Sequence, residues 1–182
     1  DARTAHRLTT ESLALMEPLD RANPLHAAEL EDVYATACND AVAVGDLRAA
    51  LATARLILDA DLHGDYPYLS VSKVLPALVL SGDLPQARRL APAMWDGWLR
   101  AGRPPAVWLP AAARFAALAH GLRGEAGAML TWQARAADAA GTEPAFHGRH
   151  APLATFVAAR VAVHTGTARA AGTAAHPGTA AH

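Results

Sequence analysis

Residues 81–88 read SGDLPQAR, and this short stretch decides the fold. On both sides of it, apolar residues recur every three or four positions, as they do in amphipathic helices. A glycine just past a helix can adopt the left-handed conformation that ends the helix. The aspartate after it can accept hydrogen bonds from the free N–H groups that begin the next helix. Gly82-Asp83 therefore predicts a tight turn that folds two helices back on each other.

The same glycine–acid pair occurs at three places in the chain. Gly45-Asp46 lies 37 residues before Gly82-Asp83, and Gly124-Glu125 lies 42 residues after it. Gly166 follows after another 42 residues, with Thr167 in place of the acid. A period near 40, made of helix, turn and helix, is typical of stacked helical hairpins. The sequence thus predicts an all-α fold with about eight helices, arranged as antiparallel hairpins in a right-handed α-solenoid.

The apolar periodicity places the individual helices. They are expected near residues 4–17, 24–44, 47–58, 66–81, 84–101, 106–122, 125–140 and 152–164. The first is interpreted as the second helix of a preceding repeat, with Leu8 and Leu15 on its inner face. Pro76 and Pro92 should kink their helices, since the apolar period continues through both; the alternative is that each proline splits its helix in two.

The repeats are predicted near residues 25–62, 66–101, 106–141 and 152–175, the last incomplete, within one domain that spans residues 1–165. Residues 166–182 are rich in alanine and glycine and are predicted to be a low-complexity tail, with a short frayed helix over residues 167–175 at its start.

The composition limits the function classes. The net charge of −1 argues against a nucleic-acid-binding surface, which is normally basic. No apolar run approaches the ~20 residues that span a bilayer, and no signal peptide is visible, so we expect a cytoplasmic protein without a membrane partner. Cys38, the single cysteine, is expected to be a small buried apolar residue. The chain begins at Asp1, which favours a processed form or an excised fragment.

The two-helix repeats, in which a Gly-Asp turn joins the helices, resemble a degenerate form of the tetratricopeptide class. A closer resemblance rests on residues 68–101, which contain the SGDLPQAR turn and MWDGW at 94–98, and on ALAHGLRGE at 117–125. These stretches resemble the C-terminal helical regions of large actinobacterial transcriptional regulators. The resemblance implies a region that docks proteins or senses an effector in a cytoplasmic regulator. It implies no catalytic residues.

A binding module of this type would present the first helix of each hairpin on a concave face. The residues expected near that face are polar or aromatic, as recognition surfaces favour: Tyr34, Asn39, Tyr68, Ser72, Trp108, Arg114 and His120. The predicted partner is a protein or peptide segment, or a small effector, with no cofactor. Among the tryptophans, Trp95, Trp98 and Trp108 are expected in the core, and Trp132 is expected to be the most exposed.

Two loops imitate metal sites. Residues 59–65 begin like a calcium loop, but Ser70 stands where the twelfth position needs a bidentate glutamate, so we interpret them as a polar linker. His147 and His150 lie on the longest loop, without the third and fourth ligands that a zinc site needs. We therefore expect no bound metal.

No P-loop, dinucleotide fingerprint, nucleophile elbow or metalloprotease motif is present in the sequence. The leading hypothesis is therefore a non-catalytic binding module. One alternative is a structural or oligomerisation arm, including a homodimer. The other is a small helical enzyme or metal protein that uses the loop from His147 to His150.

Overall fold

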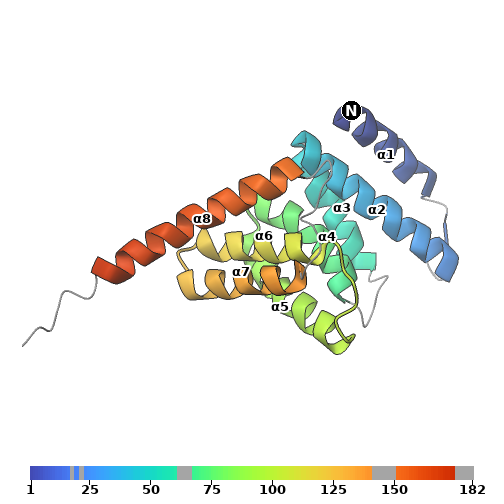
Figure 1. Ribbon diagram of the computed structural model, residues 1–182. Coiled ribbons are helices and arrows are strands. Elements are labelled where there is room, and N and C mark those ends of the chain that lie inside the picture. The colour runs from blue at the N-terminus through green and yellow to red at the C-terminus, as the bar shows by residue number, and fades with distance from the viewer. Residues whose placement is uncertain (17–18, 21–22, 61–66, 141–150, 175–182) are drawn as a thin grey trace, which may run out of the picture.

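The computed structural model describes residues 1–16, 19–20, 23–60, 67–140 and 151–174. Within them the chain forms eight α-helices and no strand, which confirms the all-α prediction. The helices, shown in Figure 1, are α1 (Ala2–Met16), α2 (Pro24–Val44), α3 (Leu47–Ala60), α4 (Pro67–Leu80), α5 (Leu84–Arg100), α6 (Leu109–Gly121), α7 (Ala126–Ala140) and α8 (Ala151–Ala174). Over this part of the chain, no helix has the length and apolar character of a membrane span.

The glycine–acid pairs form the turns that the sequence predicts. Gly45 ends α2 with a φ of 81°, and Gly82 ends α4 with a φ of 84°. Asp46 begins the next helix, since its carboxylate accepts a hydrogen bond of 3.0 Å from the N–H of Ala49. Asp83 accepts the equivalent bond at the start of α5, at 3.2 Å. Each pair thus supplies both a helix stop and a helix start.

Helix α4 lies at the centre of the packing. It contacts α2, α3, α5 and α6, and Val74, Leu75, Ala77 and Leu78 are completely buried in it. Pro76 lies inside α4 and Pro92 inside α5, and both helices continue through their prolines, so the alternative of split helices is wrong.

The even-numbered helices contact one another in series, from α2 to α4, from α4 to α6 and from α6 to α8. Alanines on α6 allow its neighbours to come close, because five of them are buried: Ala112, Ala113, Ala116, Ala117 and Ala119. At Gly121 the approach is closest. A Cβ there would lie 2.9 Å from Met129 Sδ on α7 and 3.3 Å from His164 Cβ on α8. A side chain at this position would therefore require Met129 and His164 to shift where α6, α7 and α8 meet.

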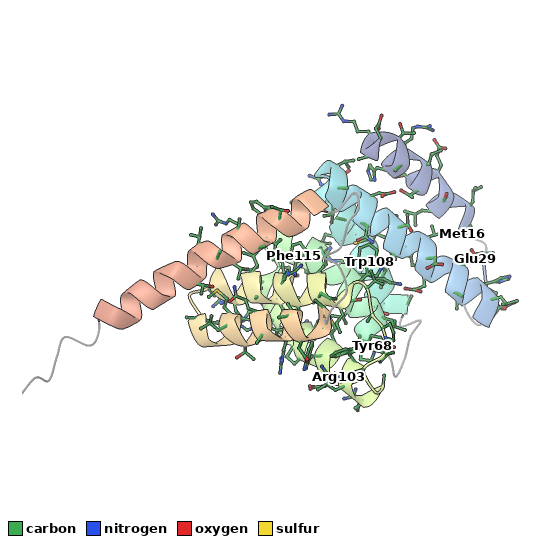
Figure 2. All side chains as sticks on the ribbon, in the orientation of Figure 1. Met16, Glu29, Tyr68, Arg103, Trp108 and Phe115 are labelled. Carbon is green, nitrogen blue, oxygen red and sulfur yellow. The ribbon has the colours of Figure 1, made fainter. Side chains whose placement is uncertain are left out.

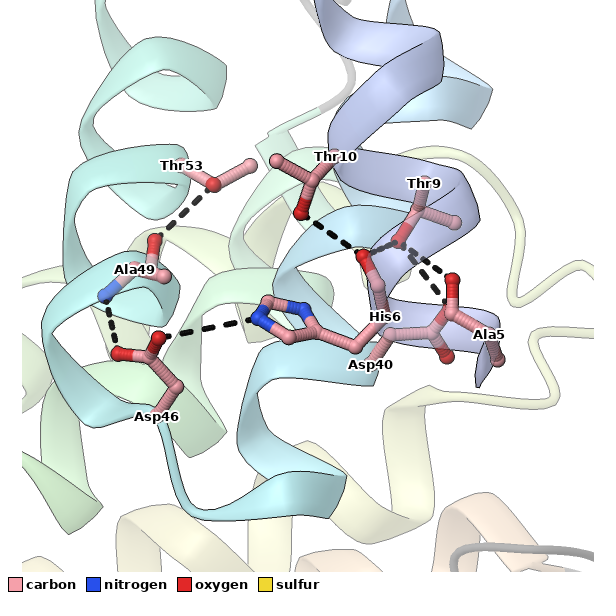
Figure 3. A network of polar contacts seen from close by, with 8 residues as sticks. All are labelled: Ala5, His6, Thr9, Thr10, Asp40, Asp46, Ala49 and Thr53. Atoms are coloured by element: carbon pink, nitrogen blue, oxygen red, sulfur yellow. Dashed lines mark hydrogen bonds and ion pairs between the residues drawn. The ribbon is translucent and has the colours of Figure 1, made fainter. Parts of the chain in front are cut away.

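Polar contacts join helix α1 to α2 and to the start of α3, as Figure 3 shows. His6 Nε2 lies 3.7 Å from Asp46 Oδ2, and the Thr9 hydroxyl lies 3.4 Å from Asp40 Oδ2. Leu8 and Leu15 were predicted on the inner face, but 49% and 71% of their surfaces are exposed. That prediction was wrong because the side of α1 that faces α2 and α3 places Thr9 against Asp40 and His6 against Asp46, while Leu13 and Met16 pack against the core.

Helix α8 differs most from its prediction. The sequence predicts a helix end near His164 and a turn at Gly166, yet α8 continues to Ala174. The short helix expected over residues 167–175 is thus the continuation of α8 and not a separate helix after a turn, and residues 175–182 lie outside the described part of the chain. Glycine inside a helix costs only about 1 kcal/mol relative to alanine, so Gly166 alone does not stop it. In Figure 1 the C-terminal part of α8 extends beyond the other helices.

The tryptophans of α5 and α7 form one buried cluster. The rings of Trp95 and Trp98 are 4.9 Å apart, and Trp132 meets Trp95 edge-on at 6.2 Å. Only 3% of Trp132 is exposed, so its predicted exposure was wrong. The guanidinium of Arg135 covers the Trp132 ring at 4.5 Å, and this cation explains how a tryptophan off the main apolar stripe is shielded from water.

Candidate partner-binding surface

Three of the predicted partner-binding residues are core residues. Tyr34, Tyr68 and Ser72 are each less than 10% exposed. In Figure 2, Tyr68 and Trp108 lie near the packed centre of the molecule, whereas Met16 and Glu29 lie at the end formed by α1 and α2. Because α4 has neighbours on four sides, Tyr68 and Ser72 turn inward, and a partner on the surface would not reach them.

The other candidates keep some accessible surface. Trp108 precedes α6 and is half-buried, as are Asn39 on α2 and Arg114 on α6. His120 lies at the end of α6, where its side chain is 12% exposed and engaged with Glu125. Of the predicted residues, Asn39, Trp108 and Arg114 are thus the ones that a bound molecule could touch without disturbing the packing.

One narrow stripe of α4 remains accessible. Its members are Leu69, Lys73, Pro76 and Leu80, spaced by four, three and four residues along one helix face. On the neighbouring α2, Asp32 and Asn39 are accessible, and on α6, Pro110, Ala111 and Arg114 are. Since α2, α4 and α6 contact one another in series, we call these accessible residues together the even-helix surface.

An ion pair crosses the even-helix surface. Lys73 Nζ on α4 contacts Glu31 Oε1 on α2, and the two side chains are 14% and 11% exposed. Burial lowers the pKa of Lys73 below its ordinary value of 10.5, because a partly dehydrated ammonium is harder to charge. Lys73 is not among the partner-binding residues predicted from the sequence. The available signal was a single lysine, the only one in the chain, within the otherwise uncharged stretch of residues 67–80.

Cys38 lies beside this pair, but its thiol is expected to be unreactive. Its Sγ is 3.6 Å from the carbonyl oxygen of Ala50 and 3.9 Å from that of Lys73. Burial raises its pKa to about 12, so the thiol stays protonated near neutral pH. This confirms the interpretation of Cys38 as a small buried apolar residue.

A second cluster of ionisable side chains lies where α5, α6 and α7 meet. Glu125 Oε2 is 2.6 Å from His120 Nδ1, and its Oε1 is 2.8 Å from Arg88 Nη2 and 3.4 Å from Arg123 Nε. Glu125 was predicted to cap the following helix, as Asp46 and Asp83 do. Its longer side chain instead reaches across to basic groups on the neighbouring helices, so this part of the prediction was wrong.

These contacts make Glu125 sensitive to acid. The hydrogen bond with His120 is the main cause of a lowered Glu125 pKa, and the charge of Arg88 lowers it further. The stabilisation is therefore complete above the ordinary pKa of 4.5 and is lost as pH falls through the lowered value.

We expect Glu125→Gln to lower the melting temperature by roughly 2 °C at pH 7, since a partly exposed ion pair contributes modestly. Thermal unfolding followed by circular dichroism from pH 7 down to pH 3 should show the difference shrinking below pH 4.5. Glu11→Gln, which breaks the exposed pair of Arg7 and Glu11, is the control and should have a smaller effect. A difference between wild type and Glu125→Gln that persists unchanged in acid would contradict this assignment.

No group of three or more histidine, cysteine or acidic side chains suited to a metal ion occurs among the described residues. The two loops that imitate metal sites are not covered by that statement, because residues 61–66 and 141–150, including His147 and His150, lie outside the described part of the chain.

Comparison of the chain with protein-family models, with curated proteins and with solved structures gives no match.

Proposed function

We propose that this chain is a non-catalytic binding module whose even-helix surface docks a peptide segment or a partner protein. The observation that carries the proposal is the partly accessible stripe of α4, in which one lysine and one proline lie between two leucines along an otherwise buried helix. Partly exposed apolar side chains such as Leu69 and Leu80, next to charged ones, suit a surface that recognises peptides. The serial contacts of α2, α4, α6 and α8 support the further proposal that the helices form a tetratricopeptide-like right-handed solenoid.

The charges of the even-helix surface suggest the chemistry of the partner. Lys73 already has Glu31 as its ionic partner, whereas Arg114 brings a guanidinium to the accessible edge of α6. A segment with one or two apolar side chains for Leu69 and Leu80, and a carboxylate opposite Arg114, would fit.

The setting of this module is proposed from resemblance. Residues 68–101 and 117–125 resemble the helical regions of actinobacterial transcriptional regulators, and this supports a docking or effector-sensing role in a cytoplasmic regulator. In such a protein, this segment would contact neither nucleic acid nor membrane.

A peptide library displayed on phage and selected against the full chain tests the proposal. We expect enriched peptides to bind Leu69→Ala and Arg114→Ala at least about tenfold more weakly than wild type, as loss of an interface anchor does. Leu130→Ala on α7 is the matched control, because Leu130 is exposed but lies on an odd-numbered helix, and it should bind as wild type does. A library that yields no enriched peptide, or peptides insensitive to both even-helix variants, would refute the proposal.

A further inference from the structure

We infer that the outer face of α8 is a self-association surface, on which α8 of a second copy of this chain lies antiparallel. The face consists of Phe156, Ala159, Val163 and Gly166, which we call the outer stripe. All four are exposed, with Phe156 at 50% and Val163 at 61%. Their spacing of three, four and three residues keeps them on one side of the helix, as in helices that pair along their length.

The inner face of α8 is already occupied. Val157 and Val161 are buried, and α8 contacts α6 and α7. Both α4 and α6 pack against two even-numbered helices, whereas α8 packs substantially against one, α6, among the even helices of the described chain. The outer stripe is therefore where the series of even helices would continue.

The outer stripe is complementary to itself in the antiparallel direction. If two copies of α8 cross between Ala159 and Val163, Phe156 of one helix faces Gly166 of the other. Ala159 of one then faces Val163 of the other. Each large side chain thus meets a small one, and the two-fold symmetry of the pair makes each of these contacts occur twice. In a parallel pair, Phe156 would meet Phe156 and Gly166 would meet Gly166, which leaves a bulge at one end and a gap at the other.

Gly166 is free to receive a partner. A Cβ built at this position meets nothing within 4 Å, so the fold of one copy does not need glycine there. This differs from Gly121, where a Cβ would meet both α7 and α8. The space above Gly166 is suited to an aromatic ring from a second copy.

The opposite end of the molecule lacks these properties. The exposed face of α1 carries an ion pair between Arg7 and Glu11, with Leu8 and Leu15 on either side of Glu11. The described outer face of α8 carries one charge, Arg160. A terminal helix of a stack stays soluble through a polar outer face, and α1 has one whereas α8 does not. The outer face of α8 is therefore better suited to self-association than that of α1.

Sedimentation equilibrium of the full chain between about 1 and 200 μM tests the inference. We expect the mass to rise from the 18.9 kDa of one chain toward twice that value. Val163→Glu should weaken the dimer about a hundredfold or more, because it buries a charge at two symmetric positions. Gly166→Leu should weaken it as well while leaving the single chain folded, as circular dichroism would confirm.

Leu15→Glu, at the exposed leucine of α1, is the control and should dimerise like wild type. A mass of 18.9 kDa at every concentration would overturn the inference, and so would equal loss of dimer in Leu15→Glu and Val163→Glu.

Cysteine cross-linking tests the direction of the pair. Under mild oxidation, a mixture of Ala159→Cys and Val163→Cys chains should form mixed disulfide dimers, because these positions face each other in the antiparallel arrangement. The buried Cys38 takes no part. Ala159→Cys alone should cross-link at least about tenfold more slowly, since its neighbour across the interface is Val163. Faster self-linking of Ala159→Cys than of the mixture would show a parallel pair and overturn the proposed geometry.

Discussion

Replacing Leu75 with alanine should lower the free energy of unfolding by about 3–5 kcal/mol. Leu75 is completely buried in α4, where α2, α3, α5 and α6 all converge. The lost methyl groups leave a cavity that four separate neighbours would have to move to fill. The loss should be measured by urea denaturation followed by circular dichroism at 222 nm.

Two further variants separate the cavity from other effects. Leu75→Met conserves volume and should cost less than about 1.5 kcal/mol. Leu25→Ala removes the same atoms from a leucine that is 77% exposed at the start of α2, and it should change stability by less than about 0.5 kcal/mol. Equal losses for Leu75→Ala and Leu25→Ala would contradict the central position of α4.

Replacing Lys73 with methionine should cost about 3 kcal/mol, because the largely buried carboxylate of Glu31 would keep its charge and lose the ammonium of Lys73. The methionine fills much the same volume, so the loss reports the charge rather than a cavity. Chemical denaturation at pH 7 measures it.

The double variant Lys73→Met, Glu31→Leu provides the control. Removing both charges should return the stability to within about 1 kcal/mol of wild type, since apolar residues replace buried ion pairs at little cost. A double variant as unstable as Lys73→Met would mean that the lysine stem, and not the ion pair, holds α2 and α4 together.

The turns could be predicted from the sequence because their chemistry is local. Gly45 and Gly82 need only their own backbone freedom and an acid as the next residue, so both helix boundaries came out correctly. Gly124 also has a positive φ, of 74°, in the turn between α6 and α7. The eight helices follow from these turns and from apolar periodicity.

Features that depend on distant neighbours could not be predicted in this way. Glu125 meets Arg88 and Trp132 meets Trp95, and each of these partners lies 37 residues away in the sequence. Gly166 continues a helix although Gly45 ends one, because glycine permits either conformation and its surroundings decide. None of these neighbours is visible in the spacing of one segment.

The candidate surface was predicted only in part for a related reason. Periodicity identifies an apolar face, but α4 is covered on four sides and leaves one stripe accessible. Tyr68 and Ser72 therefore lie inside, and Leu69 and Lys73 are only partly accessible. Sequence alone could have identified Lys73 as unusual, but not Glu31 as its partner.

The position of Cys38 makes its thiol an intrinsic reporter of local unfolding in this protein. The thiol is completely buried where α2, α3 and α4 meet, and it is the only one in the chain. A water-soluble thiol reagent can therefore react only after α2 has separated from its neighbours and the group has regained an ordinary acidity. The rate at which Cys38 is labelled under native conditions thus measures how often the junction of α2, α3 and α4 opens locally. The measurement reports on this one residue and needs no added probe. A ligand that clamps α2 to α4 would be detected as protection of that one sulfur.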